Sequence, residues 1–211
     1  MKKYILSLSI LLALTLNVSA QDYSLPSQYY TLSWNITFPQ GDLKDWADET
    51  SLNGFDFGGR YLIMDGLMAG FNLGWQRVDK LYENTTYTLP DRGVAITADN
   101  YRITYMVPFQ AVVAYHFLPD YRITPYVGLG IGGDYMQHHL VIQEYDLYKE
   151  KWDFSLTPEI GALVRFNSYS SWGLLVAFNY KWTTNKIELY EKTSENLQML
   201  NLKVGVAISV Y

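Results

Sequence analysis

The sequence contains no cysteine, so it offers neither a disulfide framework nor a thiol for lipid attachment. A cysteine-free exported chain of this size must obtain its stability from apolar burial or from a bilayer. After its first 20 residues the sequence also lacks any apolar run near 18 residues, which argues against a transmembrane helix. Basic residues are scattered, 16 Lys and Arg against 21 Asp and Glu, so the basic patch that a nucleic-acid partner requires is missing.

The first 20 residues are expected to form a cleaved export signal. Two lysines precede an apolar run over residues 4–16, and small residues follow it up to Ala20. This run is shorter than the roughly 20 residues of a membrane-spanning helix. We therefore predict cleavage after Ala20 and a single domain over residues 21–211, because a mature chain of roughly 190 residues has the size of one domain.

The sequence is rich in alternating apolar and polar residues. From Trp152 to Phe166 every second residue is apolar, and the residues between them include Asp153, Glu159 and Arg165. Side chains on a strand alternate between its two faces, so this segment has one apolar wall and one polar wall. Its length exceeds the roughly five or six residues of an ordinary strand. It suffices to cross a bilayer, which takes about 9–11 tilted residues.

The same alternation recurs in seven other segments. They cover residues 30–38, 55–61, 67–76, 101–117, 127–134, 172–182 and 200–210. An even number of strands with every edge paired suits a medium that cannot hydrogen-bond free backbone groups. The sequence therefore predicts an all-β fold, a transmembrane eight-stranded antiparallel up-and-down β-barrel.

The connections between these segments alternate in length. The short ones are 64–66, 118–122 and 167–171, and the long polar ones are 40–50, 78–100, 137–150 and 184–196. Alternate connections of an up-and-down meander lie at the same end. We therefore expect short turns at one rim and long extracellular loops at the other, as in outer-membrane barrels.

Soluble β-sandwiches and lipocalin-like barrels also alternate, so the composition of each wall decides which wall faces lipid. The apolar wall is uniformly bulky and includes Trp34, Trp75, Trp172 and Trp182. Eight strands enclose an interior just wide enough for side chains, and this many rings would overfill it. We therefore expect the bulky wall to contact lipid, with Trp and Tyr at the strand ends in interfacial belts.

Three segments give the chain a family resemblance: SWNITFPQGD at 33–42, TPYVGLGIGG at 124–133 and TPEIGALVRF at 157–166. They resemble small outer-membrane β-barrel proteins of Gram-negative bacteria, the OmpA/OmpX/OmpW-like group with its barrel-only members of Bacteroidetes type. The resemblance spans the mature chain, and its motifs specify a fold rather than a reaction. It implies a place in the cell outer membrane, contact with the membrane lipid, and insertion by the barrel-assembly machinery.

The polar wall is predicted to carry six charged side chains into the lumen. They are Asp56, Arg60, Glu159, Arg165, Lys181 and Lys203. A buried charge is costly unless it is paired, so these groups are expected to form a salt-bridge network that plugs the lumen. A selectivity ring in a narrow pore is the alternative interpretation, with gating or ligand binding as further ones. The narrow eight-strand geometry favours the plug.

No catalytic, cofactor or metal site is predicted, and we do not expect an enzyme. Ser155 faces inward with Glu159, but the acyl chemistry of some barrels needs a histidine base and no histidine lies on their strand. His138 and His139 are expected at an exposed loop base, where neighbouring strand residues point to opposite faces and cannot share one ion. His116 is expected to hydrogen-bond inside the lumen.

The sequence favours a structural or surface-interaction role. Residues 80–87, 144–152 and 190–196 are rich in Tyr, Asp, Glu and Asn, which suits recognition of an extracellular ligand or protein. A narrow channel for small solutes is the alternative. A lipid-modifying barrel enzyme and a soluble secreted sandwich that binds a ligand are less favoured.

Overall fold

The computed structural model describes residues 24–89, 94–167, 170–184, 188–189, 192–193 and 196–211. The predicted export signal and its cleavage point lie outside these residues, and the single domain over 21–211 stays a prediction.

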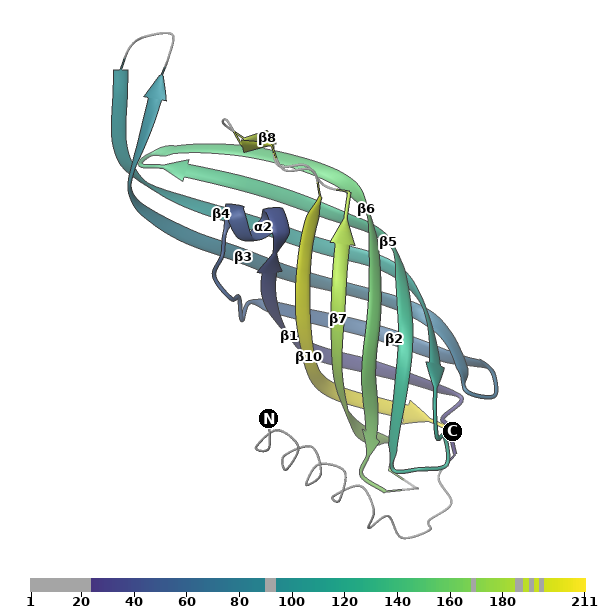
Figure 1. The fold of residues 1–211 in the computed structure, drawn as a ribbon. Helices are drawn as coiled ribbons and strands as arrows, with labels where there is room; N and C mark the ends of the chain where they lie inside the picture. Colours follow the sequence, from purple (N-terminus) through teal and green to yellow (C-terminus); the bar gives the residue numbers. More distant parts are fainter. Residues whose placement is uncertain (1–23, 90–93, 168–169, 185–187, 190–191, 194–195) are drawn as a thin grey trace, which may run out of the picture.

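Eight antiparallel strands close into a ring in the order β1, β10, β7, β6, β5, β4, β3, β2 (Figure 1). The strands are β1 (Gln28–Gln40), β2 (Gly54–Met64), β3 (Leu67–Leu89), β4 (Val94–His116), β5 (Ile123–Ile142), β6 (Tyr145–Arg165), β7 (Trp172–Thr183) and β10 (Leu197–Val210). The helix α2 (Gly41–Trp46) follows β1, and β8 (Glu188–Leu189) pairs with β9 (Lys192–Thr193) outside the ring. Each barrel strand pairs with its neighbour in sequence, and β1 closes the ring against β10. The predicted eight-stranded up-and-down barrel is therefore confirmed.

The bulky wall points outward, as predicted. On β1, Trp34 is 51% exposed whereas Asn35 is fully buried, and Trp172 on β7 is 53% exposed. This alternation continues along β7 and β10, where exposed and buried residues follow one another. The inner wall carries small and polar residues that fit a narrow ring. A Cβ atom at Gly132 on β5, for example, would overlap the carbonyl oxygen of Phe109, so glycine there lets β4 and β5 approach closely.

Short connections lie at one end of the barrel. This turn rim contains the connections 65–66, 117–122 and 166–171, together with the end of β10. The opposite end, the loop rim, contains residues 41–53 and the connection from β5 to β6. The predicted segregation of short turns to one rim is confirmed over the described residues.

Four strands project beyond the others at the loop rim. β3, β4, β5 and β6 have 20 to 23 residues, whereas β1, β2, β7 and β10 have 11 to 14. The predicted loops at 78–100 and 137–150 were therefore wrong, because these segments continue as strands and only residues 90–93 and 143–144 connect them. Beyond the bilayer both faces of a sheet can meet water, so the apolar alternation fades while β-branched and aromatic residues still favour strands.

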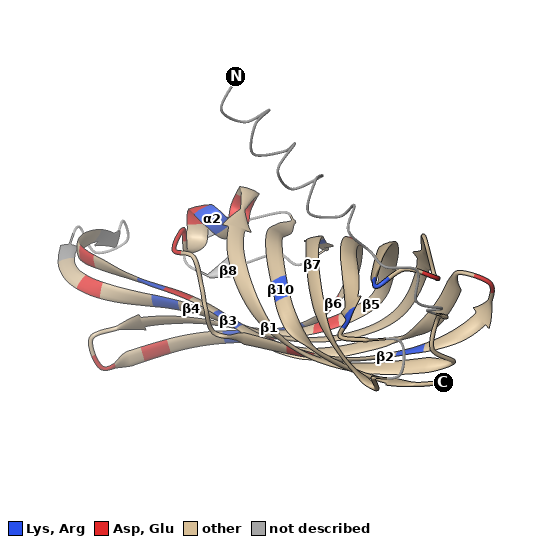
Figure 2. Ribbon diagram, turned by 90° about the horizontal axis from the view of Figure 1, so that it is seen from below, with Lys and Arg blue, Asp and Glu red and all other residues tan. Residues whose placement is uncertain are grey.

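Charged residues gather on this projecting sheet and around α2, and others lie on the strands between the two rims (Figure 2). The exposed side chains between the rims include many large hydrophobic ones, which fits an apolar band between two polar rims. No helix in the described part of the chain is both long and apolar enough to cross a membrane.

Candidate functional site

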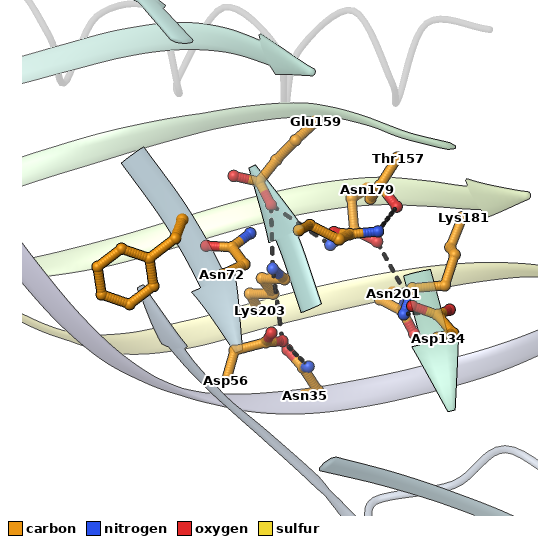
Figure 3. Close-up of polar contacts among 12 residues, drawn as sticks. Asn35, Asp56, Asn72, Asp134, Thr157, Glu159, Asn179, Lys181, Asn201 and Lys203 are labelled. Carbon is orange, nitrogen blue, oxygen red and sulfur yellow. Dashed lines mark hydrogen bonds and ion pairs between the residues drawn. The ribbon is translucent and has the colours of Figure 1, made fainter. Parts of the chain in front are cut away.

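The inward-facing side chains converge in the lumen, where the middle of the barrel contains a cluster of charged groups (Figure 3). Lys203 Nζ lies 3.4 Å from Asp56 Oδ2 and 3.2 Å from Glu159 Oε2. The Asn35 amide donates a hydrogen bond to Asp56, and the Tyr126 hydroxyl donates one to Glu159 at 2.7 Å. β10 thus supplies one buried cation between carboxylates of β2 and β6.

A second ion pair lies beside the first. Lys181 Nζ is 3.1 Å from Asp134 Oδ2, and both side chains are buried. The Ser155 hydroxyl donates to Asp134 at 3.0 Å. Gln110 in turn donates to Ser155 at 2.9 Å and to Thr157 at 2.8 Å. Ser155 is therefore engaged with a carboxylate and an amide.

Arg60 and two asparagines complete this network. The Asn201 amide donates to Asn179 at 2.8 Å, and Asn179 donates to Glu159 at 3.4 Å. The Arg60 guanidinium donates to Asn72 at 3.0 Å and to two main-chain carbonyl oxygens at 2.7 and 2.9 Å. Such contacts satisfy charged groups that would otherwise be costly to bury.

Arg165 lies apart from the network, at the turn rim. Its guanidinium donates to the carbonyl oxygens of Pro119 and Tyr121 at 2.6 and 2.5 Å, and to the Thr124 hydroxyl at 3.1 Å. It also donates to the carbonyl oxygen of Ser24. This side chain ties the segment before β1 and the turn between β4 and β5 to the base of β6.

The structure thus places all six charged residues singled out in the sequence inside the barrel, but in different environments. Asp56, Glu159 and Lys203 form one group, Lys181 pairs with Asp134, and Arg165 hydrogen-bonds main-chain carbonyl oxygens at the turn rim. Sequence reasoning missed Asp134 as the partner of Lys181. The sequence did contain a signal for it, because Asp134 lies on the same polar face of its strand as the glycines.

Little space remains among these side chains. One cavity is bordered by Arg60, Asp56, Glu159 and Lys203. The space in it that the centre of a water molecule can occupy is about 10 Å³. A cavity of this size holds about one water.

α2 folds into the mouth of the barrel at the loop rim (Figure 1). Leu43 and Trp46 are three residues apart, so they share one helix face, and both are buried. They pack in an apolar cluster with Ala47, Val78, Met106, Met136, Leu140, Leu197 and Met199. We call α2 with this cluster the apolar cap. The alternation of apolar and polar residues did not reveal this cluster, because Met106 and its neighbours are apolar residues at positions of the polar wall.

Contacts from the projecting sheet hold the apolar cap. The Arg102 guanidinium lies 5.2 Å from the Trp46 ring centroid, and the Tyr82 hydroxyl donates to the Trp46 carbonyl oxygen at 3.3 Å. Lys80 forms an ion pair with Asp48, just beyond α2, and this hydrogen bond lowers the pKa of the Asp48 carboxyl.

The three histidines have three different environments. His116 Nε2 lies 3.1 Å from the Tyr29 hydroxyl in the lumen, which confirms the predicted hydrogen bond. The exposed position expected for His138 was wrong: it is buried on β5, 2.9 Å from the Thr104 hydroxyl, because β5 continues past the expected loop base. His139 points outward, 3.0 Å from Asp146. Across the described residues, no group of three or more His, Cys, Asp or Glu side chains could hold a metal ion.

An apolar outer wall, a ring without free edges and a polar interior define a transmembrane β-barrel of the outer-membrane type. The model of the family described as "Outer membrane protein beta-barrel domain" matches residues 8–209, so the chain belongs to that family. The protein is located in the cell outer membrane of a Gram-negative envelope, with its apolar wall in the membrane lipid. Curated protein sequences give no significant match.

Solved structures of outer-membrane proteins resemble this chain at low sequence identity. Neisserial surface protein A is 14% identical with a TM-score of 0.51, over 87% of this chain and 97% of that one. Ail, the attachment invasion locus protein of Yersinia pestis, is 11% identical with a TM-score of 0.45, over 88% of this chain and 98% of that one. OprG from Pseudomonas aeruginosa is 9% identical with a TM-score of 0.46, over 92% and 100%. The likeness to Neisserial surface protein A shows a shared fold.

Proposed function

We propose that this protein is a non-conducting outer-membrane barrel that presents its projecting sheet outside the cell for interaction with external molecules. The observation that carries the proposal is the continuation of β3–β6 beyond the other four strands, above a lumen into which buried polar side chains point. In this proposal the loop rim faces outward and the turn rim faces the periplasm, the usual arrangement of such barrels. Insertion by the barrel-assembly machinery belongs to the same proposal.

The projecting sheet has features of an interaction surface. In the described part of the chain, no strand pairs with the outer edge of β3 over residues 78–89. Unpaired strand edges expose backbone donors and acceptors that an extended segment of another protein can use. Tyr145, Tyr148 and Leu147 near the tip of β6 are exposed and add aromatic and apolar contact area.

The interior favours a plug over a channel or an enzyme. The ion pairs and amides leave room for about one water, and the apolar cap lies above them. To cross the barrel, an ion would have to displace both the ion-pair network and the apolar cap. Ser155 hydrogen-bonds Asp134 and Gln110, and His116 hydrogen-bonds Tyr29, so these two side chains do not form a nucleophile–base pair.

Single-cysteine variants test the orientation, because the chain has no cysteine of its own. Tyr145→Cys and Leu81→Cys on the projecting sheet should react on intact cells with a polyethylene-glycol maleimide too large for outer-membrane pores. Tyr121→Cys, which is as exposed as Leu81 but lies at the turn rim, should react only after the outer membrane is permeabilised. Labelling of Tyr121→Cys alone on intact cells would mean that the barrel has the opposite orientation.

Recording in planar lipid bilayers tests the closed lumen. The wild-type barrel should give no current steps, and neither should Leu43→Ala/Trp46→Ala, because the ion-pair network still fills the lumen below the truncated cap. Steps in the wild type, with an ion selectivity that changes in Glu159→Gln, would instead support the narrow channel.

A further inference from the structure

A pocket opens on the outer wall at the level where β3, β4 and β5 leave the apolar band. Trp75, Tyr105, Val107, Tyr135 and Gln137 line it, and its volume is about 180 Å³. We call it the aromatic pocket. It lies outside the lumen, and neither the plug nor the projecting edges account for it.

The small side chain of Val107 forms the floor of the aromatic pocket between larger rings. Tyr135 is the cross-strand neighbour of Val107 on β5, and the Trp75 ring lies 6.2 Å from the Tyr105 ring between centroids. Pro108 follows directly and has no backbone N–H to donate. The β3–β4 ladder is interrupted between the pair Leu73–Phe109 and the pair Gln76–Met106 at this point. The aromatic pocket thus lies where the pairing between β3 and β4 is interrupted.

Hydrogen-bonding groups line the side of the aromatic pocket that faces away from the membrane. The Gln137 amide donates to the Tyr135 hydroxyl at 2.9 Å and to Glu150 at 3.3 Å, and Tyr135 also donates to Glu150. On the other side, the Arg77 guanidinium lies 5.7 Å from the Tyr105 ring centroid. An amide, a carboxylate, a phenol and a guanidinium thus surround one end of the pocket.

The opposite side is continuous with the lipid-facing wall. Below Val107 and Tyr135 the outward residues are Phe109, Gly133 and Phe154, with Trp152 packed 5.6 Å from the Phe109 ring. A molecule that fills the aromatic pocket therefore touches hydrocarbon at one end and polar groups at the other. A membrane lipid seated at the headgroup level meets both conditions.

We propose that the aromatic pocket binds a sugar ring in the headgroup of an outer-leaflet glycolipid. A pyranose has an apolar C–H face that packs on aromatic rings and an edge of hydroxyls that pairs with amides and carboxylates. The headgroup of a phospholipid such as phosphatidylglycerol has no ring that could pack against Trp75 and Tyr105. The choice of the outer leaflet rests on the proposed orientation of the loop rim.

The test measures lipid retention in phosphatidylcholine nanodiscs by native mass spectrometry and titration. The probes are deep-rough lipopolysaccharide, phosphatidylglycerol as an anionic lipid without sugar, and the free core oligosaccharide without acyl chains. The test variant is Trp75→Leu/Gln137→Leu. Its matched control is Trp182→Leu/Gln198→Leu, which removes the same residue types from β7 and β10. The control lies away from the aromatic pocket, because β10 is opposite β4 in the ring. A shift in gel mobility between unheated and heated samples checks that each variant is folded. If the double variant does not fold, Gln137→Leu alone replaces it.

The wild-type barrel should retain lipopolysaccharide in preference to phosphatidylglycerol, and the pocket variant should bind it about tenfold or more weakly. The control should stay within roughly twofold of wild type. Equal binding by wild type and pocket variant would overturn the proposal, and so would equal retention of phosphatidylglycerol. Oligosaccharide binding as tight as that of the glycolipid would also overturn it, in favour of a soluble glycan. Nanodiscs expose both rims, so this result is independent of the orientation that cysteine labelling tests.

Discussion

Replacing Lys203 with methionine should destabilise the barrel by about 3–5 kcal/mol. Lys203 is the cation between Asp56 and Glu159, and its removal leaves two buried carboxylates without their shared partner. The carboxylates lie beside a cavity that holds about one water, so hydration cannot replace the ammonium group. The Asn35 and Asn179 amides and the Tyr126 hydroxyl remain as donors, but none of them supplies a compensating charge.

Urea unfolding in lipid vesicles, followed by tryptophan fluorescence, measures this loss. The matched control is the triple variant Asp56→Asn/Glu159→Gln/Lys203→Met, which removes all three charges with little change in volume and should recover most of the stability. If the single variant loses less than about 1 kcal/mol, water must reach the carboxylates. That outcome would contradict the plug and favour the narrow channel.

Arginine in place of Val204 should cost about 2–4 kcal/mol, whereas arginine in place of Val210 should cost about 0–1 kcal/mol. The two valines lie on the same strand and the same outer face, with exposed fractions of 45% and 43%. They differ in depth, because Val204 pairs with Trp34 midway along β1 whereas Val210 ends β10 at the turn rim. A cation near the middle of the bilayer is costly, and one at the interface reaches water.

The same unfolding measurement compares the two variants. A clear difference between them requires that the outer wall lies in hydrocarbon. If both variants lose equally little stability, the wall would be in contact with water at every depth. The chain would then match the soluble lipocalin-like barrel considered from the sequence.

The fold was predictable where the membrane imposes a pattern. The segment from Trp152 to Phe166 matches the part of β6 that lies in the apolar band, and its phase correctly set the outward residues. The sequence did not indicate that β6 begins at Tyr145, because the bilayer no longer separates an apolar face from a polar one there. Hydrogen-bond pairing with β5 extends the strand instead.

The site was predictable only in part. Alternation assigned Lys203 and Glu159 to the lumen, but their contact depends on how far β10 and β6 are offset around a closed ring. Neither residue is the cross-strand partner of the other: Lys203 lies opposite Asn35 and Ala177, and Glu159 lies opposite Gly128 and Asn179. Contacts across the lumen arise from the tilt and closure of the strands, which no local pattern encodes. α2 has six residues, too few for its apolar periodicity to be recognised.

The continuous pairing of β5 with β6 from the bilayer to the tip has a mechanical consequence. No described hinge or linker separates the projecting sheet from the barrel wall, and the β5–β6 ladder continues from Ile123–Val164 to Ile142–Tyr145. A pulling force applied at a tip therefore loads the hydrogen bonds of the wall along the strand direction, all of them together. If the projecting sheet binds an external molecule as proposed, that contact would be held by the shear strength of the barrel itself.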